Sequence, residues 1–101
     1  MKVKEISNEE LHQKMNLENI VIVDVREEEE HDEGHIPDAT LIPLGQLANR
    51  YHELGKEEMI YVICHSGGRS AMACHFLQQK GYKNVVNVVE GMCKWNGKIV
   101  K

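Results

Sequence analysis

One short segment, Cys64-His65-Ser66-Gly67-Gly68-Arg69-Ser70, holds the residues best suited to nucleophilic chemistry. An apolar run at residues 59–63 leads into it and a helical pattern begins near Ser70, so it is predicted to be a loop between a strand and a helix. Such a loop directs backbone N–H groups at one point, where the helix dipole favours an anion. Thiol pKa values in such settings fall from about 8.5 to roughly 3.5–7.5. Cys64 is therefore predicted to be a thiolate within reach of solutes.

A lone cysteine at a strand end is more often a small buried hydrophobic residue, and this is the alternative interpretation of Cys64. The neighbouring residues favour the nucleophile instead. Gly67 and Gly68 carry no Cβ atoms that would block a tight concave turn, and Arg69 closes the loop with a permanent cation. The expected site is a small anion-binding cup around one sulfur atom.

A second group of polar residues follows another apolar run. Residues 20–23 are β-branched throughout, which is typical of a strand buried on both faces of a parallel sheet, and the run ends at Asp24-Val25-Arg26. Ligands of open α/β sheets bind beyond the carboxyl ends of the strands. We therefore expect Asp24 and Arg26 to lie near Cys64, either supporting the loop by hydrogen bonds or forming a structural ion pair.

The remaining chain alternates between strand and helix patterns. Strands are predicted at residues 3–6, 39–42 and 85–89, and a first helix at residues 8–15 begins with a capping box formed by Ser7 and Glu10. A second helix is predicted to begin at Pro43, with a core-facing stripe of apolar residues, namely Leu44, Leu47, Ala48, Tyr51 and Leu54. Trp95, in a short last helix, should close one side of the core. Right-handed crossovers then predict an α/β fold in which about five mostly parallel strands have helices on both faces.

The acidic run at residues 27–33 is predicted to be a short helix or turn with a solvated face, and a partner-docking surface is the alternative. The chain has 101 residues and a net charge of −4, which favours a single domain over residues 1–101 and excludes the basic face of a nucleic-acid-binding protein. It contains neither an apolar run long enough to span a bilayer nor a signal-peptide core, so we expect a cytoplasmic protein with no membrane partner.

The three cysteines are an odd number in a chain without a secretory signal, so reduced thiols are expected rather than disulfides. Cys74 should lie at the margin of the inward face of the helix after the loop and have a packing role there, and a role as a resolving thiol is the alternative. Cys64-His65 and Cys74-His75 offer four metal ligands, but their spacing fits no zinc pattern, and neighbouring helical residues point about 100° apart. No metal or other cofactor is expected.

Three motifs together resemble the rhodanese-like sulfurtransferase family over most of the chain. The first is the Cys64 loop, the second is Asp24-Val25-Arg26-Glu27 followed by Gly34-His35-Ile36-Pro37-Asp38-Ala39, and the third is Glu90-Gly91-Met92 with Trp95. The resemblance implies the family's three-layer sandwich, in agreement with the fold predicted from the alternating pattern. Relatives commonly have Gly-Gly where this chain has Glu90-Gly91, which affects the expected shape and polarity of the pocket rim.

The resemblance implies a thiosulfate sulfurtransferase in which Cys64 takes a sulfane sulfur from thiosulfate or a persulfide and passes it, as a Cys64 persulfide, to cyanide or to a small-molecule or protein thiol. His65, Ser66, Gly67, Gly68 and Arg69 would form the substrate-binding loop. Asp24, Arg26 and Ser70 would support it, although Ser70 is expected mainly to cap the following helix. His35 is open between a supporting and a structural role.

Two rival functions remain. A persulfide carrier or sensor would use the same cysteine without turnover. A phosphatase or arsenate reductase would also use a cysteine loop ending in arginine, but family comparison associates those reactions with Cys-x5-Arg, whereas Cys64 and Arg69 form the shorter Cys-x4-Arg. The smaller loop favours sulfur transfer.

Overall fold

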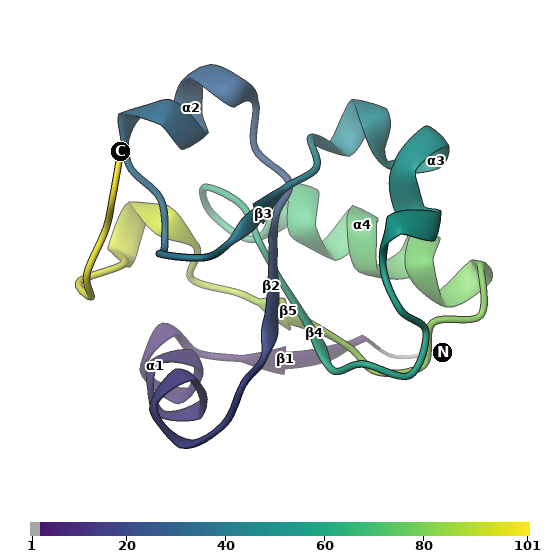
Figure 1. Ribbon diagram of the computed structural model, residues 1–101, viewed down its shortest axis with the longest axis horizontal. Helices are drawn as coiled ribbons and strands as arrows, with labels where there is room; N and C mark the ends of the chain where they lie inside the picture. The colour runs from purple at the N-terminus through teal and green to yellow at the C-terminus, as the bar shows by residue number, and fades with distance from the viewer. Residues whose placement is uncertain (1–2) are drawn as a thin grey trace.

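The computed structural model describes residues 3–101, and its centre is a five-stranded sheet with the order β1-β5-β4-β2-β3 (Figure 1). The strands are β1 (Lys4–Ile6), β2 (Val21–Asp24), β3 (Thr40–Leu41), β4 (Ile60–Ile63) and β5 (Val85–Val88). The α-helices are α1 (Asn8–Leu17), α2 (Glu28–Glu33), α3 (Leu47–Arg50) and α4 (Gly68–Gln79). Short 3-10 helices are η1 (Leu44–Gln46), η2 (Tyr51–Glu53) and η3 (Met92–Lys94).

All four strand pairings are parallel, which confirms the predicted α/β class. The central strands β2 and β4 pair from Val21 with Ile60 to Asp24 with Ile63, so both strands end at the same level. Residues that follow these two strands, which include Arg26 and Cys64, are thereby brought to one edge of the sheet. This edge carries the predicted site.

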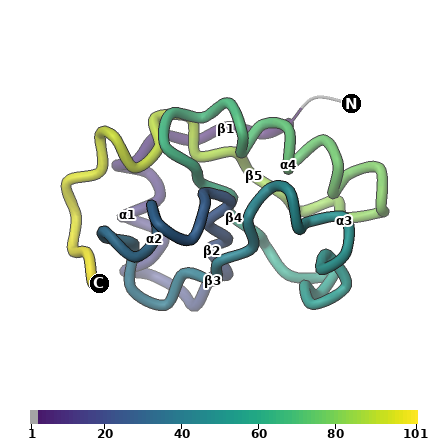
Figure 2. The backbone as a smooth tube through the Cα atoms, turned by 90° about the horizontal axis from the view of Figure 1, so that it is seen from above, coloured from purple at the N-terminus to yellow at the C-terminus, as the bar shows by residue number. Residues whose placement is uncertain are grey.

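Helices cover both faces of the sheet, as predicted. Figure 2 shows α1 and α2 on one side of the strands and α3 and α4 on the other. Side chains of β4 alternate between two apolar clusters: Ile60 and Val62 lie in the cluster on the α3 and α4 side, whereas Tyr61 and Ile63 lie in the cluster that contains Leu11 of α1. Cys64 continues the first set, which places its side chain beneath α4.

The helix at residues 8–15 is present as α1, and its predicted capping box is formed by Ser7 and Glu10.

The helix predicted from Pro43 is broken into η1, one turn of α3 and η2. Leu47 and Leu54 of its apolar stripe are buried, but Ala48 is exposed, so the prediction of one regular helix with Ala48 in its stripe is wrong. These short segments still bury the two leucines and partly bury the other large stripe residues, Leu44 and Tyr51, because 3-10 and α turns present nearly the same face over a few residues.

The last residues run back over the start of the second motif. His35 and Val100 form an isolated antiparallel bridge with both N–O distances at 2.9 Å, and the C-terminus lies near α2 in both Figure 1 and Figure 2. The hydrophobic periodicity of the sequence did not indicate this contact.

Across residues 3–101, the structure contains no helix of the length and apolarity that a membrane crossing requires.

Candidate active site

Cys64 is the first residue after β4, and its side chain is almost completely covered, with 1% of the residue exposed. It packs in the same apolar cluster as Cys74 and Val62. The expectation that its sulfur is open to solutes is therefore wrong for this conformation. The strand alternation that directs the side chain beneath α4 is the cause.

The Cys64 sulfur nevertheless lies among hydrogen-bond donors. The backbone N–H of Gly67 donates to Sγ at 3.1 Å, and Ser70 Oγ lies 3.4 Å from it. Burial acts to raise the pKa of Cys64, but the Ser70 hydroxyl and the backbone amides of Ser70, Gly67 and Ser66 act against it, and the pKa is lowered overall. The cup of amides predicted from the strand–loop–helix pattern is present around the sulfur.

Ser70 does not cap α4, because the N-cap residue is Gly67 and the helix begins at Gly68. Ser70 is the third residue of the helix and is buried. Its hydroxyl lies within hydrogen-bond distance of Gly67 O, at 3.1 Å, and of the side-chain oxygen of Asn87. Asn87 Nδ2 in turn donates to Gly67 O at 3.3 Å. The capping role is thus a wrong prediction, and Ser70 and Asn87 together fix the loop from below.

The two glycines of the loop have different roles. Gly67 has φ +96°, and a Cβ atom there would collide with the carbonyl oxygen of Val89, so both its conformation and its position require glycine. A Cβ atom at Gly68 would meet nothing within 4 Å, and this residue starts the helix with ordinary φ. Only Gly67 is therefore needed for the shape of the loop.

Arg69 is bound by a carboxylate from another element. Its Nη1 and Nη2 donate to Oε1 and Oε2 of Glu30 at 2.7 and 2.9 Å, and each side chain is about one-third exposed, at 34% and 33%. Hydrogen bonding to Arg69 lowers the pKa of Glu30 to about 2. One residue of the acidic run predicted to be a solvated face is therefore an ion-pair partner of the cysteine loop.

Asp24 and Arg26 form a buried ion pair, with Nη2 and Oδ2 at 2.7 Å and with exposed side-chain fractions of 1% and 7%. Asp24 also contacts His31 Nδ1 at 3.0 Å, and Arg26 Nη2 donates to Gly34 O at 2.9 Å. Burial acts to raise the pKa of Asp24, but hydrogen bonds from Arg26 and His31 lower it overall. These bonds hold α2 and the following turn rather than residues 65–69, so the pair supports the loop only through the element that carries Glu30.

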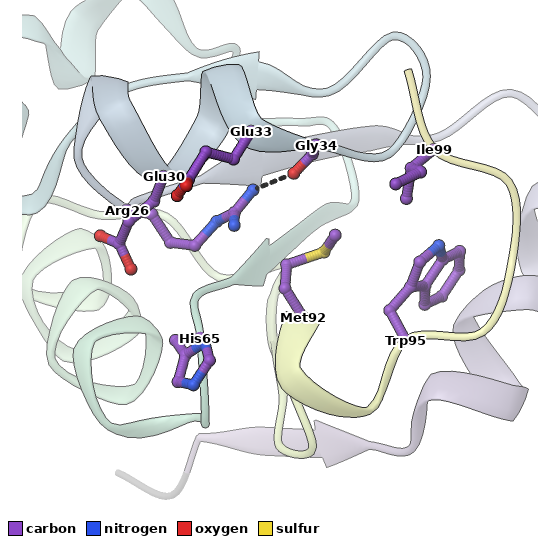
Figure 3. A pocket seen from close by; sticks show the side chains of 8 residues that line it. All are labelled: Arg26, Glu30, Glu33, Gly34, His65, Met92, Trp95 and Ile99. Carbon is purple, nitrogen blue, oxygen red and sulfur yellow. Dashed lines mark hydrogen bonds between the residues drawn. The ribbon is translucent and has the colours of Figure 1, made fainter. Parts of the chain in front are cut away.

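A pocket of about 390 Å³ opens beside the loop (Figure 3). Its lining residues come from the loop, from α2 and the residues around it, and from the C-terminal segment: Arg26, Glu30, Glu33, Gly34, His65, Met92, Trp95 and Ile99. Arg26 and the two glutamates gather on one side, and Met92, Trp95 and Ile99 on the other. His65 connects this pocket to the cup, because it follows Cys64 directly and is exposed.

Comparison with known proteins identifies the family and the fold. The model of the family described as "Rhodanese-like domain" matches residues 7–98. The chain belongs to the rhodanese-like domain family. It is 37% identical to a sulfurtransferase of Allochromatium vinosum, over 92% of this chain and 88% of the relative. A rhodanese-like domain protein of Staphylococcus aureus has a similar structure, with a TM-score of 0.89, 36% identity, and coverage of 95% of this chain and 94% of that one.

A further relative is larger than the rhodanese-like domain described here. YrkF of Bacillus subtilis, which is provisionally named as a sulfur carrier protein, is 47% identical over 95% of this chain. The match covers 52% of YrkF, so the chain spans about half the length of that relative.

The residue that departs from the family pattern, Glu90, turns away from the cysteine loop. Its Oε1 accepts a hydrogen bond from the backbone N–H of Asn8 at 2.7 Å, at the start of α1. The neighbouring Gly91 has φ +73° and approaches the His65 carbonyl so closely that a Cβ atom would collide with it. In this rhodanese-like domain the second glycine of the usual pair therefore keeps the close contact, while the first has become a helix-binding glutamate.

The other two cysteines have separate environments. Cys74 is fully buried, and burial raises its pKa to about 12, which suits the packing role predicted for it. Cys93 is exposed, and its backbone N–H donates to His65 O at 2.9 Å. Over residues 3–101 the structure contains no group of three histidine, cysteine or acidic side chains that could hold a metal ion.

Sequence reasoning missed two residues of the site in this rhodanese-like domain, Asn87 and Glu30. Asn87 is a polar residue buried among valines of a strand, with an exposed fraction of 2%. Its presence in an apolar run was a signal that a buried hydrogen bond had to be satisfied. Glu30 gave no such signal, because it stands among other acidic residues and its partner is 39 positions away.

Proposed function

We propose that this chain is a sulfurtransferase in which Cys64 carries the sulfur as a persulfide. The observation that carries the proposal is the Cys64 sulfur itself, which accepts the Gly67 N–H at 3.1 Å and has a lowered pKa in spite of its burial. A purely structural buried thiol behaves as Cys74 does, with its pKa raised to about 12. Membership of a family whose relatives include named sulfurtransferases supports the same conclusion.

In the first step the Cys64 thiolate attacks the outer sulfur of the donor. With thiosulfate, the donor's S–S bond breaks, a new S–S bond forms at Cys64, and sulfite leaves with the electron pair. With an organic persulfide R–S–SH, the leaving group is the thiolate RS⁻, which takes up the proton of the transferred sulfur. The reactions with both donors leave a terminal persulfide anion on Cys64, and neither reaction needs an oxidant or reductant.

In the second step an acceptor thiol or cyanide attacks the terminal sulfur, and the Cys64 thiolate leaves. The product is a new persulfide or thiocyanate. The amides of Ser66, Gly67 and Ser70 are fixed before the reaction, so they stabilise negative charge near the sulfur without reorganising. His65 to Arg69 form the substrate-binding loop in this proposal, and no cofactor takes part.

The burial of Cys64 adds one requirement. Because only 1% of the residue is exposed, a donor reaches the sulfur only after a local opening of the groups that cover it.

Intact-protein mass spectrometry before and after treatment with thiosulfate or a persulfide tests the proposal. The expected result is a gain of one sulfur atom that a reducing thiol removes and that Cys64→Ser abolishes. Cys74→Ala and Cys93→Ala are matched controls that should retain the gain. Loading that persists in Cys64→Ser, or that no donor produces, would show that Cys64 is not the sulfur carrier.

A carrier without turnover is the second candidate, favoured by the buried sulfur and by the similarity to YrkF. Thiosulfate and cyanide distinguish the two. An enzyme forms thiocyanate with saturable kinetics, whereas a carrier accepts sulfur only from a partner protein.

A phosphatase is less favoured, because the loop is Cys-x4-Arg and both terminal nitrogens of Arg69 are already bound by Glu30. An aryl phosphate is the probe for this activity. Cys64-dependent hydrolysis of it would reverse the preference.

A further inference from the structure

The charges around the pocket beside His65 do not suit a doubly charged donor. Arg26, which lines the pocket, is matched by Asp24 at 2.7 Å. Arg69, which lies outside the lining, is matched by the lining residue Glu30 at 2.7 and 2.9 Å. Glu33 adds a third carboxylate to the lining. Three carboxylates thus accompany two cations, and the Cys64 thiolate adds a further negative charge.

Glu30 is the residue that decides this balance. Arg69 is the only arginine or lysine of the 64–70 loop, and both of its terminal nitrogens donate to the Glu30 carboxylate. The carboxylate also lines the pocket, so an approaching anion meets it directly. Thiosulfate carries two negative charges and would have to compete with the Glu30 carboxylate for Arg69.

The opposite wall of the pocket is apolar and suits a hydrocarbon group of a ligand better than a charged group. Met92, Trp95 and Ile99 face it from the C-terminal segment (Figure 3). Ile99 remains 47% exposed, although it is a large apolar side chain, and it precedes Val100, whose backbone is bridged to His35. Trp95 is fixed by a hydrogen bond from Nε1 to Lys98 O at 3.2 Å. An apolar wall thus lies across the pocket from His65, the residue that follows the nucleophile.

We propose that Glu30 selects the sulfur donor: by occupying Arg69 it disfavours thiosulfate, and the pocket prefers an organic persulfide whose carbon atoms lie against Met92, Trp95 and Ile99. The inference rests on the proposed sulfur transfer through Cys64 and names its donor class. The transfer follows the balanced persulfide step given above, with a neutral thiol as the leaving molecule once it has taken up the proton. Glu30 acts here as a specificity residue and does not touch the transferred sulfur.

The test compares rate constants for loading Cys64 by two donors, thiosulfate and the persulfide of N-acetylcysteine methyl ester, followed by quenching and intact mass. In Glu30→Gln the thiosulfate rate constant should rise about tenfold, while that of the persulfide changes less than about twofold, because only the dianion competes for Arg69. Glu29→Gln is the matched control, since it removes the same charge from an exposed position of α2. It should change neither rate.

The apolar wall is tested by Ile99→Ser. This change should slow loading by the persulfide several-fold and leave loading by thiosulfate unchanged, because only the organic donor contacts the wall. Leu17→Ser, at an 81% exposed apolar residue at the end of α1 outside the pocket lining, is the matched control and should affect neither donor.

Each outcome decides the proposal. A fall in the thiosulfate rate in Glu30→Gln would mean that Glu30 positions Arg69 for the dianion, and an unchanged ratio of the two donors would remove the selective role; either result overturns the inference while Cys64 still loads. Equal slowing of both donors by Ile99→Ser would overturn the apolar subsite. Failure of both donors to load the unmodified protein would instead overturn the proposed function together with this inference.

Discussion

Ser70 donates a hydrogen bond to the buried side chain of Asn87, 17 positions away in sequence, and the same hydroxyl oxygen lies 3.4 Å from the Cys64 sulfur. Asn87 also donates to Gly67 O, so β5 holds both the start of α4 and the hydroxyl beside the nucleophile. The hydroxyl has one proton to share among its acceptors. The hydrogen bonding around the Cys64 sulfur therefore depends on β5, a strand that follows the loop in sequence and does not lead into it.

Replacing Ser70 by alanine should raise the pKa of Cys64, because the hydroxyl is the strongest of the groups that oppose the effect of burial. It should also cost about 1–3 kcal/mol of unfolding free energy, since Asn87 Oδ1 loses its buried donor. The pH dependence of thiolate absorbance measures the first effect and urea denaturation the second. Ser66→Ala is the control, because Ser66 acts on Cys64 through its backbone N–H; a similar pKa change in both variants would contradict the assignment.

The two adjacent loop glycines should respond in opposite directions to alanine. Gly67→Ala should destabilise the fold by at least about 1–3 kcal/mol, because it places a side chain in the left-handed region and against Val89 O. Gly68→Ala should be neutral or stabilising by up to about 1 kcal/mol, since its Cβ meets open space at a helix start. Thermal or urea denaturation checks both, and equal destabilisation would be inconsistent with the loop geometry.

The ion pair between Glu30 and Arg69 should appear in the acid stability of the protein. The pKa of Glu30 is lowered from 4.5 to about 2 in the folded state, so its contribution is complete above pH 4.5 and is lost as the pH falls towards 2. The stability difference between the unmodified protein and Glu30→Gln should therefore shrink over this interval. Urea denaturation at a series of pH values measures it, and a difference that does not change with pH would show that the ion pair does not persist in solution.

Removing one member of the buried Asp24–Arg26 pair should be among the most costly changes outside the core. Asp24→Ala leaves the Arg26 guanidinium buried without its carboxylate, which costs about 3–5 kcal/mol. The double variant Asp24→Leu, Arg26→Met should regain much of this loss, because no unpaired charge remains. Glu53→Ala, which breaks the exposed pair with Arg50, should change stability little. A small effect of Asp24→Ala would mean that the pair is not buried in solution.

The sequence by itself determined the sheet and the position of the loop. The β-branched run that ends at Asp24 and the apolar run before Cys64 could only be satisfied by strands covered on both faces, and the intervening helix patterns require parallel crossovers. The capping box of Ser7 and Glu10 could also be predicted from the sequence, because both residues lie within one helical turn. These features are local or depend on the chain's own periodicity.

Only the tertiary structure decided which groups meet the loop. The pairs of Arg69 with Glu30 and of Ser70 with Asn87 join residues 39 and 17 positions apart, and no period in the sequence connects them. The burial of Cys64 was likewise decided by packing, because residues of other elements, which include Cys74 and Leu77 of α4, cover the face of the sheet on which its side chain lies. Short-range patterns specify elements, whereas the charge and exposure of a site depend on which elements the packed core brings together.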